Sequence, residues 1–175
     1  MTNSSELDEN RFAHFTDEMN IELLLRANAV GQRARDNGDE PFGCLLADID
    51  GNVIYEGECQ VRRDNDPTQH GEVVMVKGAV KKFGAEYLAN CSAYVSGGPC
   101  AMCSGTIYWS GIGRLVYAIN IEDEENRKAL ESGSNPMLHT SFLDVFASGT
   151  RKVVIDGPYP ELQDTIMKRF EGYEF

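Results

Sequence analysis

The sequence is short of basic residues and has no long apolar run. Lysine and arginine together number 16 against 28 aspartates and glutamates, which gives a formal net charge of −12. Proteins that hold nucleic acid draw much of their affinity from basic side chains that neutralise phosphates, so this balance argues against a nucleic-acid partner. No apolar run approaches the ~20 residues that a bilayer-spanning helix needs, so we expect no membrane partner either.

Targeting and disulfide features are also scarce. Residues 1–10 are polar and acidic, without the basic start and apolar stretch of a secretory signal. The five cysteines are an odd number, and two of them share a spacing typical of metal ligands, so they do not suggest a disulfide framework. Both observations favour a cytoplasmic location. Adjacent basic residues occur, for example, at 62–63, 81–82 and 151–152, and we interpret these pairs as solvated loops or element ends. A small, uncharged substrate fits this composition better than a polyanion.

Length and periodicity predict one domain of mixed α/β class. The 175 residues are 42% hydrophobic and 25% charged, enough for one domain with a hydrophobic core. We expect residues 1–175 to form a single domain in which residues 1–14 are poorly ordered. Apolar spacing predicts helices over 15–35, 70–84, 100–109 and 161–170, and strands over 42–49, 53–55, 91–95, 114–119 and 152–155. Segment 120–136 is acidic and predicted as loop with some helix at 122–130. The alternation predicts a mixed sheet with helices on its faces.

Two short segments carry the side chains of a metal site. Residues 70–72 read His-Gly-Glu, and residues 99–103 read Pro-Cys-Ala-Met-Cys. A catalytic zinc uses three protein ligands of nitrogen or sulfur type and leaves a fourth position open for water. We therefore predict that His70, Cys100 and Cys103 hold one Zn²⁺ per chain, with Glu72 left over as a carboxylate beside the metal.

Both segments lie where a predicted helix begins. Unpaired N–H groups and the helix dipole place partial positive charge there, which favours a thiolate over a thiol. Cys100 and Cys103 are spaced i and i+3, so both sulfurs lie on one face of their helix. Pro99 loses no helical hydrogen bond at this position, because the first N–H groups of a helix have no partner.

Other interpretations of the Cys-x-x-Cys pair have less support. The surrounding sequence has no further feature of a redox protein. A structural zinc would need a fourth protein ligand, for which Cys44, Cys59 and Cys91 are nominal candidates. All three lie in or beside predicted strands, where a free cysteine is usually a small buried hydrophobe.

The order His-x-Glu followed by Pro-Cys-x-x-Cys resembles the signature of the cytidine and nucleobase deaminase superfamily. The resemblance runs from about residue 23 to 118 and includes Pro-Phe-Gly at 41–43, Asn-Asp-Pro-Thr at 65–68 and Ile-Tyr-Trp at 107–109. The last two look like bacterial guanine deaminase, whereas His-Gly-Glu looks like fungal cytosine deaminase. The resemblance implies a three-layer α/β/α cytidine-deaminase-like fold, with a mixed sheet of roughly five strands, assembled as a homodimer.

The same resemblance implies a zinc-dependent hydrolase that deaminates a free nucleobase or a related amino-heterocycle, of guanine or cytosine type, and releases ammonia. Glu72 is then the proton shuttle between water, a ring nitrogen and the departing amine. Two alternatives stay open: a tRNA or nucleoside deaminase, which needs a cationic surface, and a zinc-binding protein of this fold that has lost activity. The intact Glu72 argues against the second, since a purely structural zinc site needs no spare carboxylate.

Three features depart from the family pattern. Cys59 stands where many members have an asparagine that contacts the base, and a thiol cannot both donate and accept as an amide does. Gly98 stands before Pro-Cys, where glutamate or serine is usual. The divergent segment 120–175 lacks the Gly-Phe-Asp-Asp stretch of guanine deaminases. We therefore expect the metal chemistry to be kept and the recognition of the base to be altered.

Candidate substrate contacts are Phe42, Cys59, Gly71 and Trp109. Phe42 would line the pocket and Trp109 would stack against a ring, although core packing is the competing interpretation of both. Gly71 has no side chain, so its main chain can approach a substrate. The aromatic tail at 173–175 is predicted either as a lid over the site or as a frayed end.

Overall fold

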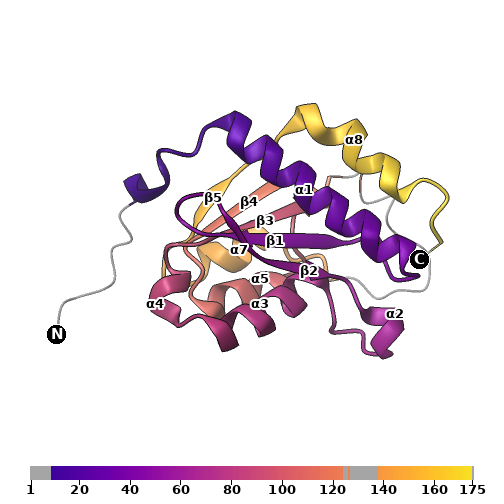
Figure 1. Ribbon diagram of the computed structural model, residues 1–175, viewed down its shortest axis with the longest axis horizontal. Helices are drawn as coiled ribbons and strands as arrows, with labels where there is room; N and C mark the ends of the chain where they lie inside the picture. The colour runs from indigo at the N-terminus through magenta and orange to yellow at the C-terminus, as the bar shows by residue number, and fades with distance from the viewer. Residues whose placement is uncertain (1–8, 124–125, 127–137, 175) are drawn as a thin grey trace.

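A computed structural model describes residues 9–123, 126 and 138–174 of the chain. Its elements follow one another in the order shown in Figure 1. They are η1 (Glu9–Phe12), α1 (Asp17–Asp36), β1 (Gly43–Ala47), β2 (Val53–Glu58), α2 (Val61–Asp64), α3 (Gly71–Lys82), α4 (Ala85–Leu88), β3 (Ser92–Gly97), α5 (Ala101–Ser110), β4 (Arg114–Ile119), α7 (Phe142–Ala147), β5 (Val154–Asp156), η2 (Pro160–Leu162), α8 (Gln163–Met167) and η3 (Lys168–Phe170).

The strands form one mixed sheet of five, in the order β2-β1-β3-β4-β5. β1 pairs antiparallel with both β2 and β3, whereas β3–β4 and β4–β5 are parallel. The predicted α/β class and the roughly five-stranded mixed sheet are therefore confirmed. Among the described residues, no helix combines the length and the apolar character needed to cross a membrane.

Helices cover both faces of the sheet. In Figure 1, α1 and α8 lie on one side of the strands and α3 and α5 on the other. Every residue of β1 is buried, and its side chains alternate between two apolar clusters. Leu45 belongs to the cluster beneath α1 and α8, whereas Cys44 and Leu46 belong to the cluster beneath α3 and α5. A strand buried on both faces reads as a continuous apolar run, as 43–47 does here.

In the part of the chain that the structure describes, the predicted elements are found with shifts of a few residues, but three α-helices were missed. α2, α4 and α7 are four to six residues long, too short to show a helical period. The predicted helix over 161–170 is divided among η2, α8 and η3. Most of the predicted helical stretch at 122–130 lies outside the described residues.

The expectation that residues 1–14 are poorly ordered stays a prediction; of these residues, the structure describes 9–14. Residues 9–12 form η1, and Phe12 is buried in the apolar cluster with Leu24 and Tyr94. Arg11 connects this segment to Ala89, because its Nη1 donates a hydrogen bond of 3.1 Å to the carbonyl oxygen of Ala89. Residues 1–8 lie outside the described part.

Candidate active site

The three predicted metal ligands meet at one point. Nδ1 of His70 lies 3.7 Å from Sγ of Cys100 and 3.5 Å from Sγ of Cys103, and the three ligand atoms all lie within 4.8 Å of one another. Tetrahedral zinc with Zn–S bonds of about 2.3 Å and Zn–N bonds of about 2.0–2.1 Å separates nitrogen from sulfur by about 3.6 Å. The arrangement therefore fits a single tetrahedral ion with three protein ligands.

Two helix starts bring these ligands together. His70 is the N-cap of α3 and Cys100 the N-cap of α5, and both have extended backbone. The helices therefore begin one residue later than predicted, so that two ligands precede the first turn. α3 and α5 pack side by side on the same face of the sheet. The free N–H groups at both N-termini add partial positive charge where thiolates would lie.

The turn before His70 is fixed by Asp66, a residue of the Asn-Asp-Pro-Thr motif. One carboxylate oxygen of Asp66 accepts hydrogen bonds from the backbone N–H and the hydroxyl of Thr68, at 2.8 and 2.7 Å. The other oxygen accepts from the side chain of Gln69 at 2.8 Å. The bond from Gln69, followed by those from Thr68, lowers the pKa of Asp66 to about 2. This part of the motif thus acts by holding the loop that leads into the ligand.

Glu72 lies in the first turn of α3 and is 9% exposed. Burial raises the pKa of its carboxyl group, whereas the neighbouring His70 lowers it. A buried carboxyl group beside three metal ligands can exchange protons with a small molecule held there.

The two thiols differ in proton affinity. A hydrogen bond from Cys103 lowers the pKa of Cys100 to about 4, and the interaction with His70 acts in the same direction. The pKa of Cys103 is raised well above its usual range, first by its bond to Cys100 and then by burial. Binding of a divalent metal requires both sulfurs as thiolates, so it would release any proton that Cys103 holds.

Gly71 is required by packing. A Cβ on Gly71 would lie 2.8 Å from the carbonyl oxygen of Gly57 and 3.4 Å from Cα of Gly43. The residue between His70 and Glu72 therefore lets α3 approach the backbone of β1 and β2. Its contact with a substrate stays a prediction.

Cys59 and Phe42 are neighbours beside this site. The N–H of Cys59 donates a hydrogen bond of 3.0 Å to the carbonyl of Phe42. Cys59 is 1% exposed, and burial raises the pKa of its thiol to about 12. The ring of Phe42 packs against that of Phe170, with 5.3 Å between centroids. Both residues thus lie under the C-terminal segment, where the sequence alone did not place them.

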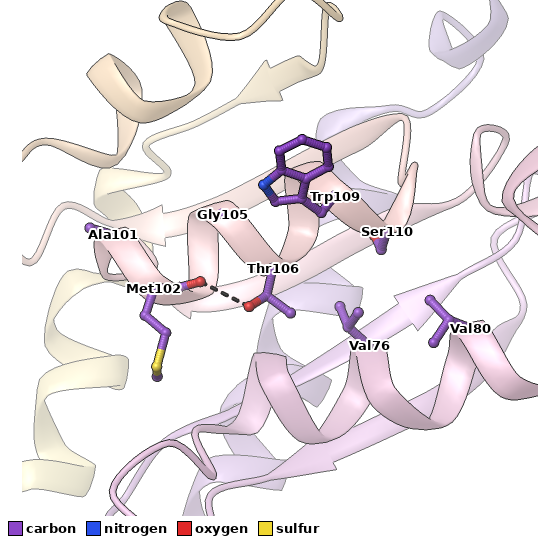
Figure 2. Close-up of a pocket in the computed structure, with 8 residues that line it drawn as sticks. All are labelled: Val76, Val80, Ala101, Met102, Gly105, Thr106, Trp109 and Ser110. Carbon is purple, nitrogen blue, oxygen red and sulfur yellow. Dashed lines mark hydrogen bonds between the residues drawn. The ribbon is translucent and has the colours of Figure 1, made fainter.

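Trp109 lies apart from the metal ligands, at the far end of α5. It is 86% exposed, so the interpretation as core packing is wrong. Its indole borders a groove of about 540 Å³ between α3 and α5 (Figure 2). The side chains that line this groove are Val76, Val80, Ala101, Met102, Gly105, Thr106, Trp109 and Ser110. A contact between Trp109 and a substrate in the same chain stays a prediction.

The unusual Gly98 has a steric explanation. A Cβ at Gly98 would lie 2.7 Å from the ring of Phe142, which belongs to the missed helix α7. Phe142 is fully buried, and its ring meets Tyr117 edge-on at 5.0 Å between centroids. The glutamate or serine usual at this position would therefore collide with α7.

The structure describes the C-terminal segment up to residue 174. Arg62 lies over the ring of Tyr173, 5.0 Å from its centroid, and donates a hydrogen bond of 2.7 Å to the carbonyl of Glu174. The alternative of a frayed end is therefore wrong for 173–174, whereas Phe175 lies outside the described residues. An arginine of the C-terminal segment, Arg169, is buried and was missed, because its neighbour Lys168 carries the same charge and no motif distinguishes the two.

Comparison with known proteins agrees with this geometry. Residues 17–119 match the family model of the cytidine and deoxycytidylate deaminase zinc-binding region. The probable cytosine deaminase of Schizosaccharomyces pombe is 38% identical over 144 residues, which cover 82% of this chain and 86% of that protein. The guanine deaminase of Bacillus subtilis is 41% identical over 93 residues, 53% of this chain and 56% of the relative.

The fold also has a match among solved structures. The guanine deaminase from Nitrosomonas europaea superposes with a TM-score of 0.68 at 15% identity, covering 96% of this chain and 95% of that one. At this identity the match concerns the fold alone, and it confirms the predicted cytidine-deaminase-like architecture. Together with the matched zinc-binding region, these similarities show that the chain belongs to the cytidine and deoxycytidylate deaminase family.

Proposed function

We propose that the protein is a zinc-dependent hydrolase that deaminates a free nucleobase or a related amino-heterocycle, replacing an amino group by oxygen and releasing ammonia. The observation that carries this proposal is the set of three ligand atoms within 4.8 Å of one another, with the buried Glu72 beside them. His70, Cys100 and Cys103 would hold one Zn²⁺ per chain. Zinc, when bound, supplies Lewis-acid activation of water.

The chain's own residues would move the protons. Glu72 takes a proton from the attacking water and delivers it to a ring nitrogen. It then takes the second proton from the new hydroxyl group on the ring carbon and passes it to the departing amine, so that the C–N bond breaks and ammonia leaves. Water is consumed and ammonia is formed, so no oxidant or reductant is needed. Burial of Glu72 supports this role, because bulk water cannot compete for the proton at a site that is 9% exposed.

Glu72→Gln tests the shuttle. This variant keeps the three ligands and removes proton transfer, so we expect full zinc content and a loss of kcat of roughly 10²-fold to 10⁴-fold. Ammonia release from guanine, cytosine, isocytosine, adenine and their nucleosides is the measurement, with metal analysis as the control. A fully active Glu72→Gln protein would show that the proton shuttle is another group.

The alternative of a tRNA deaminase has weaker support. The formal net charge of −12 leaves few cations for phosphates. A gel-shift experiment with tRNA at moderate salt should therefore show no specific complex, and tight binding would favour this alternative.

We also propose a homodimer that uses the groove between α3 and α5. The exposed Trp109 and the 44% exposed Val80 support this surface, since exposed apolar side chains that gather along one groove mark interaction sites. Trp109→Glu should halve the mass measured by light scattering. Tyr87→Glu, which changes an exposed aromatic residue outside the groove, is the matched control and should leave the dimer intact.

A cytoplasmic location is part of the same proposal. All five cysteines are free thiols, as is usual in a reducing compartment. Fractionation of cells followed by detection of the untagged protein would test it.

A further inference from the structure

Arg169 is a buried arginine that is only partly hydrogen-bonded. It lies in η3, outside the family-matched region, and is 3% exposed. Its Nη1 donates a hydrogen bond to Oδ1 of Asn28 on α1. Nε and Nη2 have no hydrogen-bond partner among the residues that the structure describes. Buried donors are almost always paired, so this side chain requires an explanation.

The two unpaired nitrogens share one edge of the guanidinium group. In an arginine side chain the N–H of Nε and one N–H of Nη2 point the same way, so that edge presents two parallel donors. Such a fork binds two adjacent acceptors in a plane, as in a carboxylate or the O6 and N7 atoms of guanine. The bond to Asn28 uses the other side of the group and fixes its orientation.

A series of close backbone contacts connects Arg169 to the metal centre. A Cβ on Gly31 of α1 would lie 3.0 Å from Nη1 and 3.2 Å from Nε, so the guanidinium lies directly on the helix backbone. Gly31 in turn packs against Gly43 of β1, whose Cα is 3.4 Å from the Cβ position of Gly71. Gly71 precedes Glu72 in the chain. Arg169 therefore lies at the same end of the sheet as Glu72, on the face that α1 and α8 cover.

Electrostatics agree with this placement. Burial lowers the pKa of Arg169 to about 9, and the charge of Glu72 is the interaction that opposes this shift. No salt bridge to Arg169 exists among the described residues. The arginine and the predicted proton shuttle thus act on each other without forming an ion pair.

The sequence departs from the family pattern at Cys59, so we expect another group to recognise the base. Cys59 stands where many members of the family have an asparagine, and its thiol hydrogen-bonds to Glu40 at 3.9 Å. A buried thiol supplies no strong pair of donors. Arg169 supplies two.

We propose that Arg169 is a specificity-determining residue whose Nε–Nη2 edge binds an oxygen and an adjacent ring nitrogen on the side of the substrate opposite its reactive amino group. This inference rests on the proposed deaminase function and names its substrate class, an aminopurine-type heterocycle. Guanine has such an acceptor pair, O6 and N7, opposite its 2-amino group. Cytosine has an N–H donor beside its oxygen on the corresponding side, so it cannot satisfy both donors.

Guanine and 7-deazaguanine form the test, because they differ only at the nitrogen that the arginine edge would contact. The wild-type protein should bind guanine roughly 10-fold to 100-fold more tightly, the range expected for one bidentate arginine–base pair. Calorimetry on the zinc-loaded protein measures binding, and ammonia release measures kcat/KM.

Two variants distinguish the contribution of the two-donor edge of Arg169 from that of its positive charge. Arg169→Lys keeps the positive charge but has no two-donor edge, and Arg169→Met removes both, so each should bind the two compounds equally well. Arg26→Met is the matched control, since Arg26 lies on α1 but is exposed and paired with Glu56. It should keep the wild-type preference.

Equal binding of the two compounds to the wild-type protein, no binding of guanine, or an unchanged preference in Arg169→Lys would each overturn the proposal. A purely structural arginine would lower the affinity for both compounds by the same factor, which also overturns it. Should Arg169→Met fail to fold by circular dichroism, Arg169→Lys and the wild-type comparison still decide. Guanine preference in binding without ammonia from any heterocycle would instead contradict the proposed deaminase function.

Discussion

Arg114 and Arg169 are both buried, yet the protein surrounds them in opposite ways. Arg114, on β4, is 1% exposed and uses all three of its nitrogens. Its Nε donates to Asp156 at 2.9 Å, Nη1 to the hydroxyl of Tyr94 at 3.2 Å and Nη2 to Oδ1 of Asn20 at 3.1 Å. The described surroundings of Arg169 satisfy Nη1 alone.

This difference separates an arginine that stabilises the fold from one that is available to a ligand. A buried network whose donors all have partners makes the native structure specific, whereas a buried donor without a partner lowers stability. Arg114 lies in the matched region 17–119 and Arg169 outside it. The family region thus builds the framework and the metal centre, and the C-terminal segment supplies the group that we propose for recognition.

The largest expected effect is at the candidate metal site. A role of Arg169 in recognising a substrate, in contrast to Arg114, requires that this site is catalytic. Cys103→Ala should lower zinc affinity by at least about 100-fold, because it removes a ligand. Replacing a group that only hydrogen-bonds to a metal ligand already lowers metal affinity by about 10-fold to 100-fold. Deaminase activity should fall with the zinc content, as measured by metal analysis. Cys91→Ala, a buried cysteine outside the site, should retain both.

The next effect tests the paired arginine. Arg114→Met leaves Asp156, Tyr94 and Asn20 without their shared partner, so the free energy of unfolding should fall by about 2–4 kcal/mol. We place the loss below that of a fully buried pair because the side chain of Asp156 is 43% exposed. Urea unfolding measures it. A variant as stable as wild type would show that the network is dispensable.

A smaller loss of stability is expected at Gly98, where the family-matched region 17–119 contacts α7. Gly98→Ser places a Cβ 2.7 Å from the ring of Phe142, and such overpacking costs about 1–3 kcal/mol. The thermal unfolding temperature should decrease accordingly. Combining Gly98→Ser with Phe142→Leu should recover part of the loss, whereas additive losses would mean that the two residues do not collide.

The smallest expected effect is a gain in stability, not a loss, and it concerns Arg169. Arg169→Met removes two buried donors without partners, so stability should stay unchanged or rise by up to about 1 kcal/mol. The loss of one hydrogen bond to Asn28 limits the gain. Urea unfolding beside Arg114→Met gives the comparison directly. A destabilisation as large as that of Arg114→Met would place both arginines in the same structural role.

The sequence by itself determined the family and predicted which residues gather at the candidate metal site, because both depend on local spacing. The i, i+3 spacing of Cys100 and Cys103 places two sulfurs on one helix face, and His70 with Glu72 opens another helix. Long periodic segments such as α1 were also predictable.

Only the tertiary structure decided the partners of residues that carry no local signal. Gly98 is a glycine because Phe142 packs on it from a six-residue helix that has no detectable period. Arg169 and Lys168 carry the same charge in the sequence, but only Arg169 is buried, against Asn28 and Gly31, some 140 positions away. Burial and hydrogen bonding between such distant segments arise from packing of the whole chain, so no local pattern can predict them.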